Sequence, residues 1–413
     1  MTFSARRTGI VDDQTHGPKD CTRLDAAINR ARPLPMVGTL LRTLRRTLSR
    51  SGLLLALIVP VLNGCGRAPE LVGIDNPDTP AESVPDVSRH RIFITTTRKA
   101  SEVTGVFFSG ERAPDLGLAS VDVTVPPIHV VGQLERPRHL PPNPATEFAV
   151  VDPIVYRNDA SFVAEVNREL AKRAPGDRKL LLFVHGFNNT TSDAILRLAQ
   201  FVEDTNYDGV PVLFTWASAA KAPRYVYDLN SALVARSMVD DMAAVLSSTN
   251  ATDVDVFAHS MGAFLTMEGL VDASREGRLN RRLNISNIML ASPDIDIDLF
   301  RTQIAQLPPA FVKKIYLLIS ADDAALKFSR RIAGGVPRVG AADARELEAL
   351  GVTVIDLSQI ADSNSGSHSK FAGSPEVVKL IGAGLNSAGR FGETPTPALT
   401  KLLSGVPITI FGK

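Results

Sequence analysis

The chain has 413 residues, of which 44% are hydrophobic and 22% are charged. These values are ordinary for a globular protein with a large core, and the length suits one large α/β domain with additions or two domains. The formal net charge of +1 gives no reason to expect a polyanionic partner. The composition therefore does not predict a protein that binds nucleic acid.

The amino-terminal part has the features of an export signal. A run of arginines at positions 42–50 precedes an apolar segment at 52–62, which is shorter than the roughly twenty residues that a membrane-spanning helix needs. Leu62-Asn63-Gly64-Cys65 then resembles a bacterial lipobox, in which Cys65 is lipidated and becomes the mature amino terminus. The alternative is a plain secretory signal with a fortuitous cysteine.

The position of this signal also bears on where the natural chain begins. Residues 1–35 show no apolar periodicity, and signals start near the amino terminus, so we expect the natural start at Met36. Residues 1–65 are then a misassigned start followed by a signal and lipobox. The protein is expected to be exported and held by a lipid anchor in the bacterial cell envelope, at the outer membrane or the periplasmic face.

Two further segments flank the expected domain. Residues 66–89 are rich in Pro, Asp, Glu and Ser, and this composition predicts an extended tether between anchor and domain. Residues 387–413 form a tail rich in Gly and Pro, with a short apolar end at 406–411 whose place the pattern does not predict.

Residues 90–386 have the pattern of one α/β domain. Residues 90–98 and 118–125 read as an antiparallel strand pair, 128–153 as a surface connection, and 160–171 as a helix. Strands and helices then alternate, which predicts a mostly parallel sheet with helices on both faces. The expected strands are 179–184, 210–216, 254–258, 285–291, 314–320 and 352–357, and the expected helices are 192–203 with Ser192 as cap, 231–246, 296–305, 341–350 and one from 375.

The strand at 254–258 leads into Ala258-His259-Ser260-Met261-Gly262, with a helical run behind it. A strand, a small residue, Ser and Gly at this spacing, and then a helix form the nucleophile elbow of the α/β-hydrolases. The turn is so sharp that bulky side chains two residues before or after Ser260 would collide. It presents the Ser260 hydroxyl above the sheet and directs the backbone N–H of Met261 toward the same point.

Acyl transfer by a serine needs a base, a carboxylate that orients the base, and donors for the oxyanion. His368 is the only histidine after Ser260 and lies in a small, polar loop past the last expected strand, so we predict it as the base. Asp323, which follows a strand end, is the predicted acid. Asp322 and Asp294 occupy similar positions and remain alternatives.

A second oxyanion donor is expected from the loop after the strand at 179–184. There, His185-Gly186-Phe187 follows directly, and we predict the backbone N–H of Phe187 as the donor and His185 as a structural residue. The acidic run that begins at Asp294 lacks the Gly turn and distal Glu of a calcium loop. We therefore predict no metal site, and the chemistry requires no cofactor.

These residues together resemble the bacterial α/β-hydrolases of the DUF900 group, over about residues 91–380. The resemblance lies in Thr96-Thr97-Arg98, Phe183-Val184-His185-Gly186-Phe187-Asn188, Phe214-Thr215-Trp216-Ala217-Ser218, Tyr227-Asp228, Ala258-His259-Ser260-Met261-Gly262, Ser292-Pro293-Asp294-Ile295-Asp296, Asp323 followed by Ala325-Leu326, and His368. It implies the hydrolase fold and a Ser260–Asp323–His368 triad, but no substrate. Ala217 stands where the family tends to have Pro.

The expected function is that of a serine hydrolase, esterase- or lipase-like, that cleaves small-molecule or lipid carboxylic esters through an acyl-enzyme. No insertion between the later strands is long enough for a large lid, so we expect an open site. An acyltransferase uses the same residues and stays open as an alternative. A non-catalytic envelope protein that uses the fold as a binding scaffold is the other alternative.

Overall fold

The structure is a computed structural model that describes residues 67–279, 283–361, 366–386 and 407–412. The chain divides into the units Met1–Arg67 and Ala68–Lys413, and the second unit carries the fold described below. The predicted signal and Cys65, and most of the tail, lie outside the described residues. In the described ranges, no helix combines the length and the apolar character that a membrane span requires.

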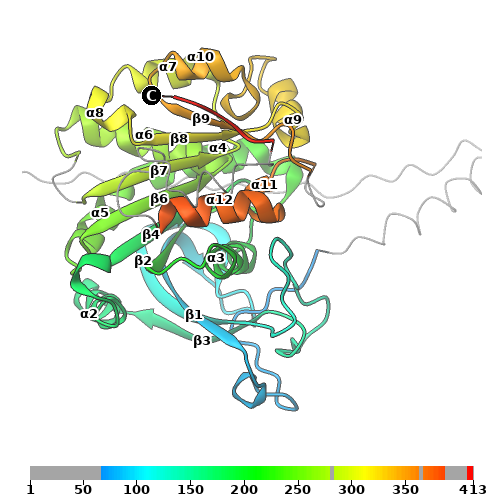
Figure 1. Cartoon of the computed structure of the whole chain (residues 1–413). Coiled ribbons are helices and arrows are strands. Elements are labelled where there is room, and N and C mark those ends of the chain that lie inside the picture. The colour runs from blue at the N-terminus through cyan, green and yellow to red at the C-terminus, as the bar shows by residue number, and fades with distance from the viewer. Residues whose placement is uncertain (1–66, 280–282, 362–365, 387–406, 413) are drawn as a thin grey trace, which may run out of the picture. The chain divides into compact units, whose positions relative to one another are not determined.

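One sheet forms the centre of the second unit (Figure 1). Its ten described strands lie in the order β10-β9-β8-β7-β6-β4-β5-β1-β2-β3. The seven strands β1 and β4 to β9 are parallel to one another, whereas β2 and β3 at one edge and β10 at the other pair antiparallel with their neighbours. The strands are β1 (Ser88–Ala100), β2 (Phe108–Val125), β3 (Ala149–Tyr156), β4 (Lys179–Val184), β5 (Val210–Thr215), β6 (Asp253–His259), β7 (Ile285–Ala291), β8 (Ile315–Ile319), β9 (Thr353–Asp356) and β10 (Thr409–Phe411).

Helices cover both faces of this sheet. Successive residues of a strand point to opposite faces, so Val256 and Phe257 of β6 belong to two different hydrophobic clusters. One cluster includes residues of α2 (Asp159–Leu170), α4 (Tyr225–Arg236), α5 (Val239–Ser247), α6 (Met261–Arg275), α7 (Ile297–Ile304), α8 (Pro309–Val312) and α10 (Ala344–Glu348). The other includes α3 (Thr191–Thr205), α11 (Lys370–Gly373) and α12 (Pro375–Leu385), which lie side by side in Figure 1. The predicted α/β architecture is confirmed.

Two predicted elements are wrong. The segment 128–153 is not wholly a surface connection, because β3 begins at Ala149 and pairs with β2. β3 contains Pro153, which is tolerated there because β3 is an edge strand. The helix expected at 231–246 is two helices, α4 and α5, with a break at residues 237–238.

The cap of α3 also differs from the prediction. Thr190, not Ser192, caps the helix, in a capping box with Asp193. Ser192 is buried within the first turn, and its hydroxyl accepts a hydrogen bond from the backbone N–H of Leu71 at 3.2 Å.

That contact shows that part of the expected tether belongs to the folded unit. Leu71 is fully buried and Val72 is 5% exposed, and Val72 forms β-bridges with Gly105 and Val150. The Pro-rich composition of residues 66–89 obscures these two apolar positions. At the other end of the chain, the apolar end of the tail forms β10 against β9.

Candidate active site

Ser260 lies at the junction of β6 and α6 in a strained backbone conformation, with φ 54° and ψ −119°. A non-glycine residue in such a region costs on the order of 1–3 kcal/mol, and such residues cluster at functional sites. The Ser260 hydroxyl makes no capping hydrogen bond to α6, so it is not committed to helix stability. A Cβ on Gly262 would lie 2.4 Å from the carbonyl oxygen of His185, which explains why the turn needs glycine there.

The structure brings Asp323 and His368 together. The Nδ1 atom of His368 lies 2.8 Å from Oδ2 of Asp323, whose side chain is fully buried, whereas the His368 side chain is 18% exposed. The other oxygen of Asp323, Oδ1, accepts from the backbone N–H of Leu326 at 2.9 Å and so caps α9 (Ala324–Ile332). The carboxylate is held on one side by α9 and orients the imidazole with the other.

His259 connects the elbow to the His368 loop. Its Nε2 donates to the backbone carbonyl of His368 at 3.0 Å, and the two imidazole rings lie 4.7 Å apart. Burial, with a smaller contribution from His368, holds the pKa of His259 well below its ordinary value, so this ring is neutral. No hydrogen bond joins the Ser260 hydroxyl to the His368 ring in the described part of the chain. Such contacts are often long in free enzymes and tighten when substrate binds.

Asp294 does not contact His368. Its carboxylate accepts from the hydroxyl groups of Tyr225 at 2.9 Å and Ser329 at 2.6 Å, and pairs with Nε of Arg338 at 3.2 Å. Burial, followed by the nearby Asp294 charge, raises the pKa of Tyr225, so the phenol stays a donor. Asp294 therefore stabilises the packing beside the elbow.

Asp322 is also committed to partners other than the imidazole of His368. Nζ of the buried Lys370 donates to it at 3.0 Å, and the Ser367 hydroxyl donates at 2.6 Å. Burial acts to raise the pKa of Asp322, but hydrogen bonds from Ser320, Ser367 and Lys370 outweigh it and lower this pKa to about 2. Asp322 thus binds Ser367 and Lys370, on either side of His368, and stabilises the position of this segment.

The loop after β4 lies against the elbow. A Cβ on Gly186 would lie 3.0 Å from Cβ of Ser260, so the loop backbone approaches the serine closely. Neither the backbone N–H of Phe187 nor that of Met261 donates to another group in the described residues. Both are therefore available to donate to another acceptor.

His185 supports this loop from within the protein, as expected of a structural residue. Its Nδ1 lies 2.8 Å from the carbonyl oxygen of Gly186, and its ring stacks on Trp216, whose Nε1 donates to the His185 carbonyl. Burial, and then the nearby Arg98 guanidinium, lowers the pKa of His185 to about 3. The ring is neutral at physiological pH and serves as a packing and hydrogen-bonding element.

The sequence matches the model of the family described as "Alpha/beta hydrolase of unknown function (DUF900)" over residues 158–384, more than half of the chain. The chain belongs to this family of α/β hydrolases. None of the curated proteins compared with the sequence matches it.

Two solved structures are among those similar to this chain. A proposed cell surface hydrolase from Lactobacillus plantarum is 10% identical, with a TM-score of 0.37, over 56% of this chain and 99% of its own. A fungal esterase from Rhizomucor miehei is 13% identical, with a TM-score of 0.32, over 73% of this chain and 84% of its own. At this distance neither indicates a substrate for this α/β hydrolase.

Arg98 was not predicted as a site residue, yet it organises the loops around the elbow. It is 2% exposed, and it donates from Nε to Thr215 at 2.8 Å and from Nη2 to the carbonyl of Asn189 at 2.8 Å. Its Nη1 donates to the carbonyl of Ser218 at 3.1 Å. The signal available in the sequence was an arginine at the end of a predicted strand, in the segment Thr96-Thr97-Arg98.

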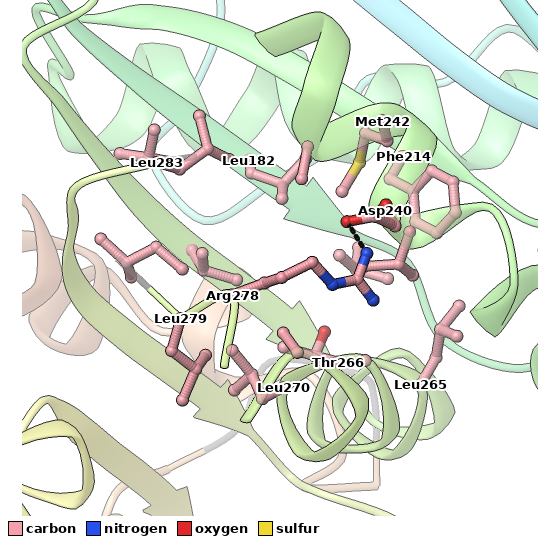
Figure 2. A pocket seen from close by; sticks show the side chains of 18 residues that line it. Leu182, Phe214, Asp240, Met242, Leu265, Thr266, Leu270, Arg278, Leu279 and Leu283 are labelled. Atoms are coloured by element: carbon pink, nitrogen blue, oxygen red, sulfur yellow. Dashed lines mark ion pairs between the residues drawn. The ribbon is translucent and has the colours of Figure 1, made fainter. Parts of the chain in front are cut away.

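A separate apolar cavity lies between the sheet and helices α5 and α6 (Figure 2). Leu182, Phe214 and Met242 line it, and the Arg278–Asp240 ion pair lies across it. Its empty space, counted together with the open solvent at its mouth, is about 770 Å³. Ser260, Asp323 and His368 are not among the lining residues. The cavity is therefore distinct from the elbow and from the Asp323–His368 pair.

Proposed function

We propose that this α/β hydrolase is a serine hydrolase of carboxylic esters that acts through a Ser260–His368–Asp323 triad. The observation that carries the proposal is the hydrogen bond between Asp323 and His368, whose backbone carbonyl accepts from His259, the residue before the strained Ser260. An imidazole whose Nδ1–H is held by a buried carboxylate has its Nε2 lone pair available as a base. Neither Asp294 nor Asp322 offers this arrangement, because each is committed to other donors.

In the proposed reaction, the Ser260 oxygen attacks the ester carbonyl while Nε2 of His368 takes the hydroxyl proton. The backbone N–H groups of Met261 and Phe187 donate to the tetrahedral oxyanion, a role worth roughly 3–4 kcal/mol per donor in comparable sites. The alcohol leaves with the proton from His368, and water, activated by the same nitrogen, hydrolyses the acyl-enzyme. Asp323 stays ionised and stabilises the imidazolium at each stage.

The test is hydrolysis of p-nitrophenyl esters of increasing acyl length by the full chain. We expect Ser260→Ala and His368→Ala to reduce kcat by a factor on the order of 10⁴ or more. Labelling by a fluorophosphonate should occur in the wild type and vanish in Ser260→Ala. A wild-type chain that neither hydrolyses any ester nor labels would favour the alternative, a non-catalytic binding scaffold. Transfer of the acyl group to an added alcohol in preference to water would favour an acyltransferase.

We also propose that the protein is exported and attached to the membrane of the cell envelope through a lipid on Cys65. The support is the basic run, short apolar segment and lipobox-like Leu62-Asn63-Gly64-Cys65. Mass spectrometry of the mature amino terminus tests it, because the proposal requires a diacylglycerol-modified Cys65 as the first residue. An unmodified Cys65, or a cut elsewhere, would refute it.

A further inference from the structure

Helix α9 begins at the proposed active site and is exposed along most of its length. Asp323, which holds His368, is its N-cap, and its first backbone N–H, that of Ala324, donates to the carbonyl of Gly366 in the His368 loop at 2.9 Å. Only Leu326 and Ser329 of this helix are buried. Ser329 contacts Tyr225 through their hydroxyl groups at 3.1 Å, and Tyr225 packs against Phe187 of the oxyanion loop.

The exposed side chains of α9 are sorted by chemistry. At about 100° per residue, Ala325, Phe328 and Ile332 fall on one flank of the helix, the flank next to Ser329. Phe328 is 57% exposed and Ile332 is 48% exposed. The apolar flank is therefore the one that continues toward the elbow and its surroundings.

The opposite flank is cationic. Lys327, Arg330 and Arg331 are exposed, and no ion pair of the described residues joins any of them to a carboxylate. The neighbouring carboxylate, Asp322, is already paired with Lys370. The helix thus presents three positive charges beside an apolar strip, and no carboxylate of the described residues neutralises them.

We propose that α9 docks the rim of the active site onto an anionic lipid surface. Interfacial helices bind lipid with an apolar side that enters the boundary of the acyl chains and with cations that contact the headgroups. The exposed Phe and Ile beside Lys and Arg on α9 have this arrangement. A second copy of the chain fits less well, because a symmetric contact would set the same three cations against one another. An apolar strip of three side chains is also small for a stable protein interface, which buries about 800 Å² on each partner.

This inference rests on the proposed function and names its substrate class. If Ser260 is the nucleophile, its substrates are esters that reside in an anionic lipid layer, against which α9 holds the rim of the site. The lipid chemistry recognised is a negatively charged headgroup above a hydrocarbon layer.

The experiment places a tryptophan on the proposed surface and asks whether lipid reaches it. The full chain is used with Cys65→Ser, so that no lipid anchor forms, and with Ser260→Ala, so that binding is measured without hydrolysis. Phe328→Trp is compared with Val155→Trp, because Val155 is 61% exposed and lies on the edge strand β3. This strand is seven strands away in the sheet from β8, the strand that precedes α9. The single native tryptophan, Trp216, is fully buried and gives the same background in both.

Phosphatidylglycerol vesicles with brominated acyl chains should quench Phe328→Trp strongly and leave Val155→Trp unchanged, and brominated phosphatidylcholine should quench neither. Adding Lys327→Gln and Arg331→Gln should weaken partition into phosphatidylglycerol roughly 30-fold. The proposal is overturned if Phe328→Trp is quenched no more than Val155→Trp, or if sedimentation shows that this face is covered by a second copy. Ester hydrolysis is measured separately, so a failure of lipid docking and a failure of the serine mechanism give different results.

Discussion

The substitution Asp323→Asn separates the proposed catalytic role of Asp323 from its structural one. Oδ1 of Asp323 caps α9 through Leu326, and Oδ2 accepts from His368. Asparagine is as good a cap as aspartate, so its amide oxygen can keep the bond to Leu326, and the free energy of unfolding should fall by less than about 1 kcal/mol. Its NH₂ group then faces Nδ1 of His368 and imposes the wrong tautomer, which leaves Nε2 protonated and unable to act as a base.

The expected loss in kcat is about 10⁴-fold, equivalent to ~5 kcal/mol of transition-state stabilisation. Asp294→Asn is the matched control, because it leaves Arg338 next to a neutral amide and should reduce stability by about 3 kcal/mol with a much smaller loss of kcat. The assay pairs p-nitrophenyl acetate hydrolysis with urea unfolding of each variant. Equal losses of kcat in the two variants, or a larger loss in Asp294→Asn, would refute the assignment of Asp323 as the acid.

Three further predictions follow from the geometry around the elbow. Gly262→Ala should lower the free energy of unfolding by more than about 2 kcal/mol, because its Cβ would lie 2.4 Å from the His185 carbonyl oxygen. The control is Gly176→Ala, which should unfold at the wild-type urea midpoint because no atom lies within 4 Å of its Cβ. Because His185 has a folded pKa of about 3 and an unfolded pKa of about 6.5, only the unfolded chain takes up this proton between those values. Stability should therefore fall as the pH falls across that window. The free energy of unfolding, measured by urea titration between pH 6.5 and 4.5, should change with pH by up to about 1.4 kcal/mol per pH unit less in His185→Gln than in the wild type; parallel slopes would contradict this. Lys370→Met removes the buried ammonium that donates to Asp322 and to the carbonyl of Leu357, so the free energy of unfolding should fall by about 3 kcal/mol and kcat should fall with it. A wild-type kcat in the folded variant would show that these contacts of Lys370 do not position His368.

Much of the fold could be predicted from the sequence, because the signals are local. The continuous apolar run at Lys179–Val184 is typical of a parallel strand covered on both faces, and the structure has β4 at these residues. The break between α4 and α5, the edge strand β3 and the burial of Leu71 could not be predicted this way. The last two depend on partners distant in the sequence, which are β2 for β3 and Ser192 for Leu71.

The sequence by itself determined the nucleophile elbow and the one histidine that follows it. The spacing of Ala258, Ser260 and Gly262 is a local steric requirement of the turn, and His368 has no competitor later in the chain. Only the tertiary structure decided which carboxylate faces that histidine. Parallel strands all end at one edge of the sheet, so Asp294, Asp322 and Asp323 are equivalent in the sequence pattern. Their partners separate them: Arg338 and Tyr225 hold the first, Lys370 holds the second, and the third is left to His368 because long-range packing sets each side chain's hydrogen bonds.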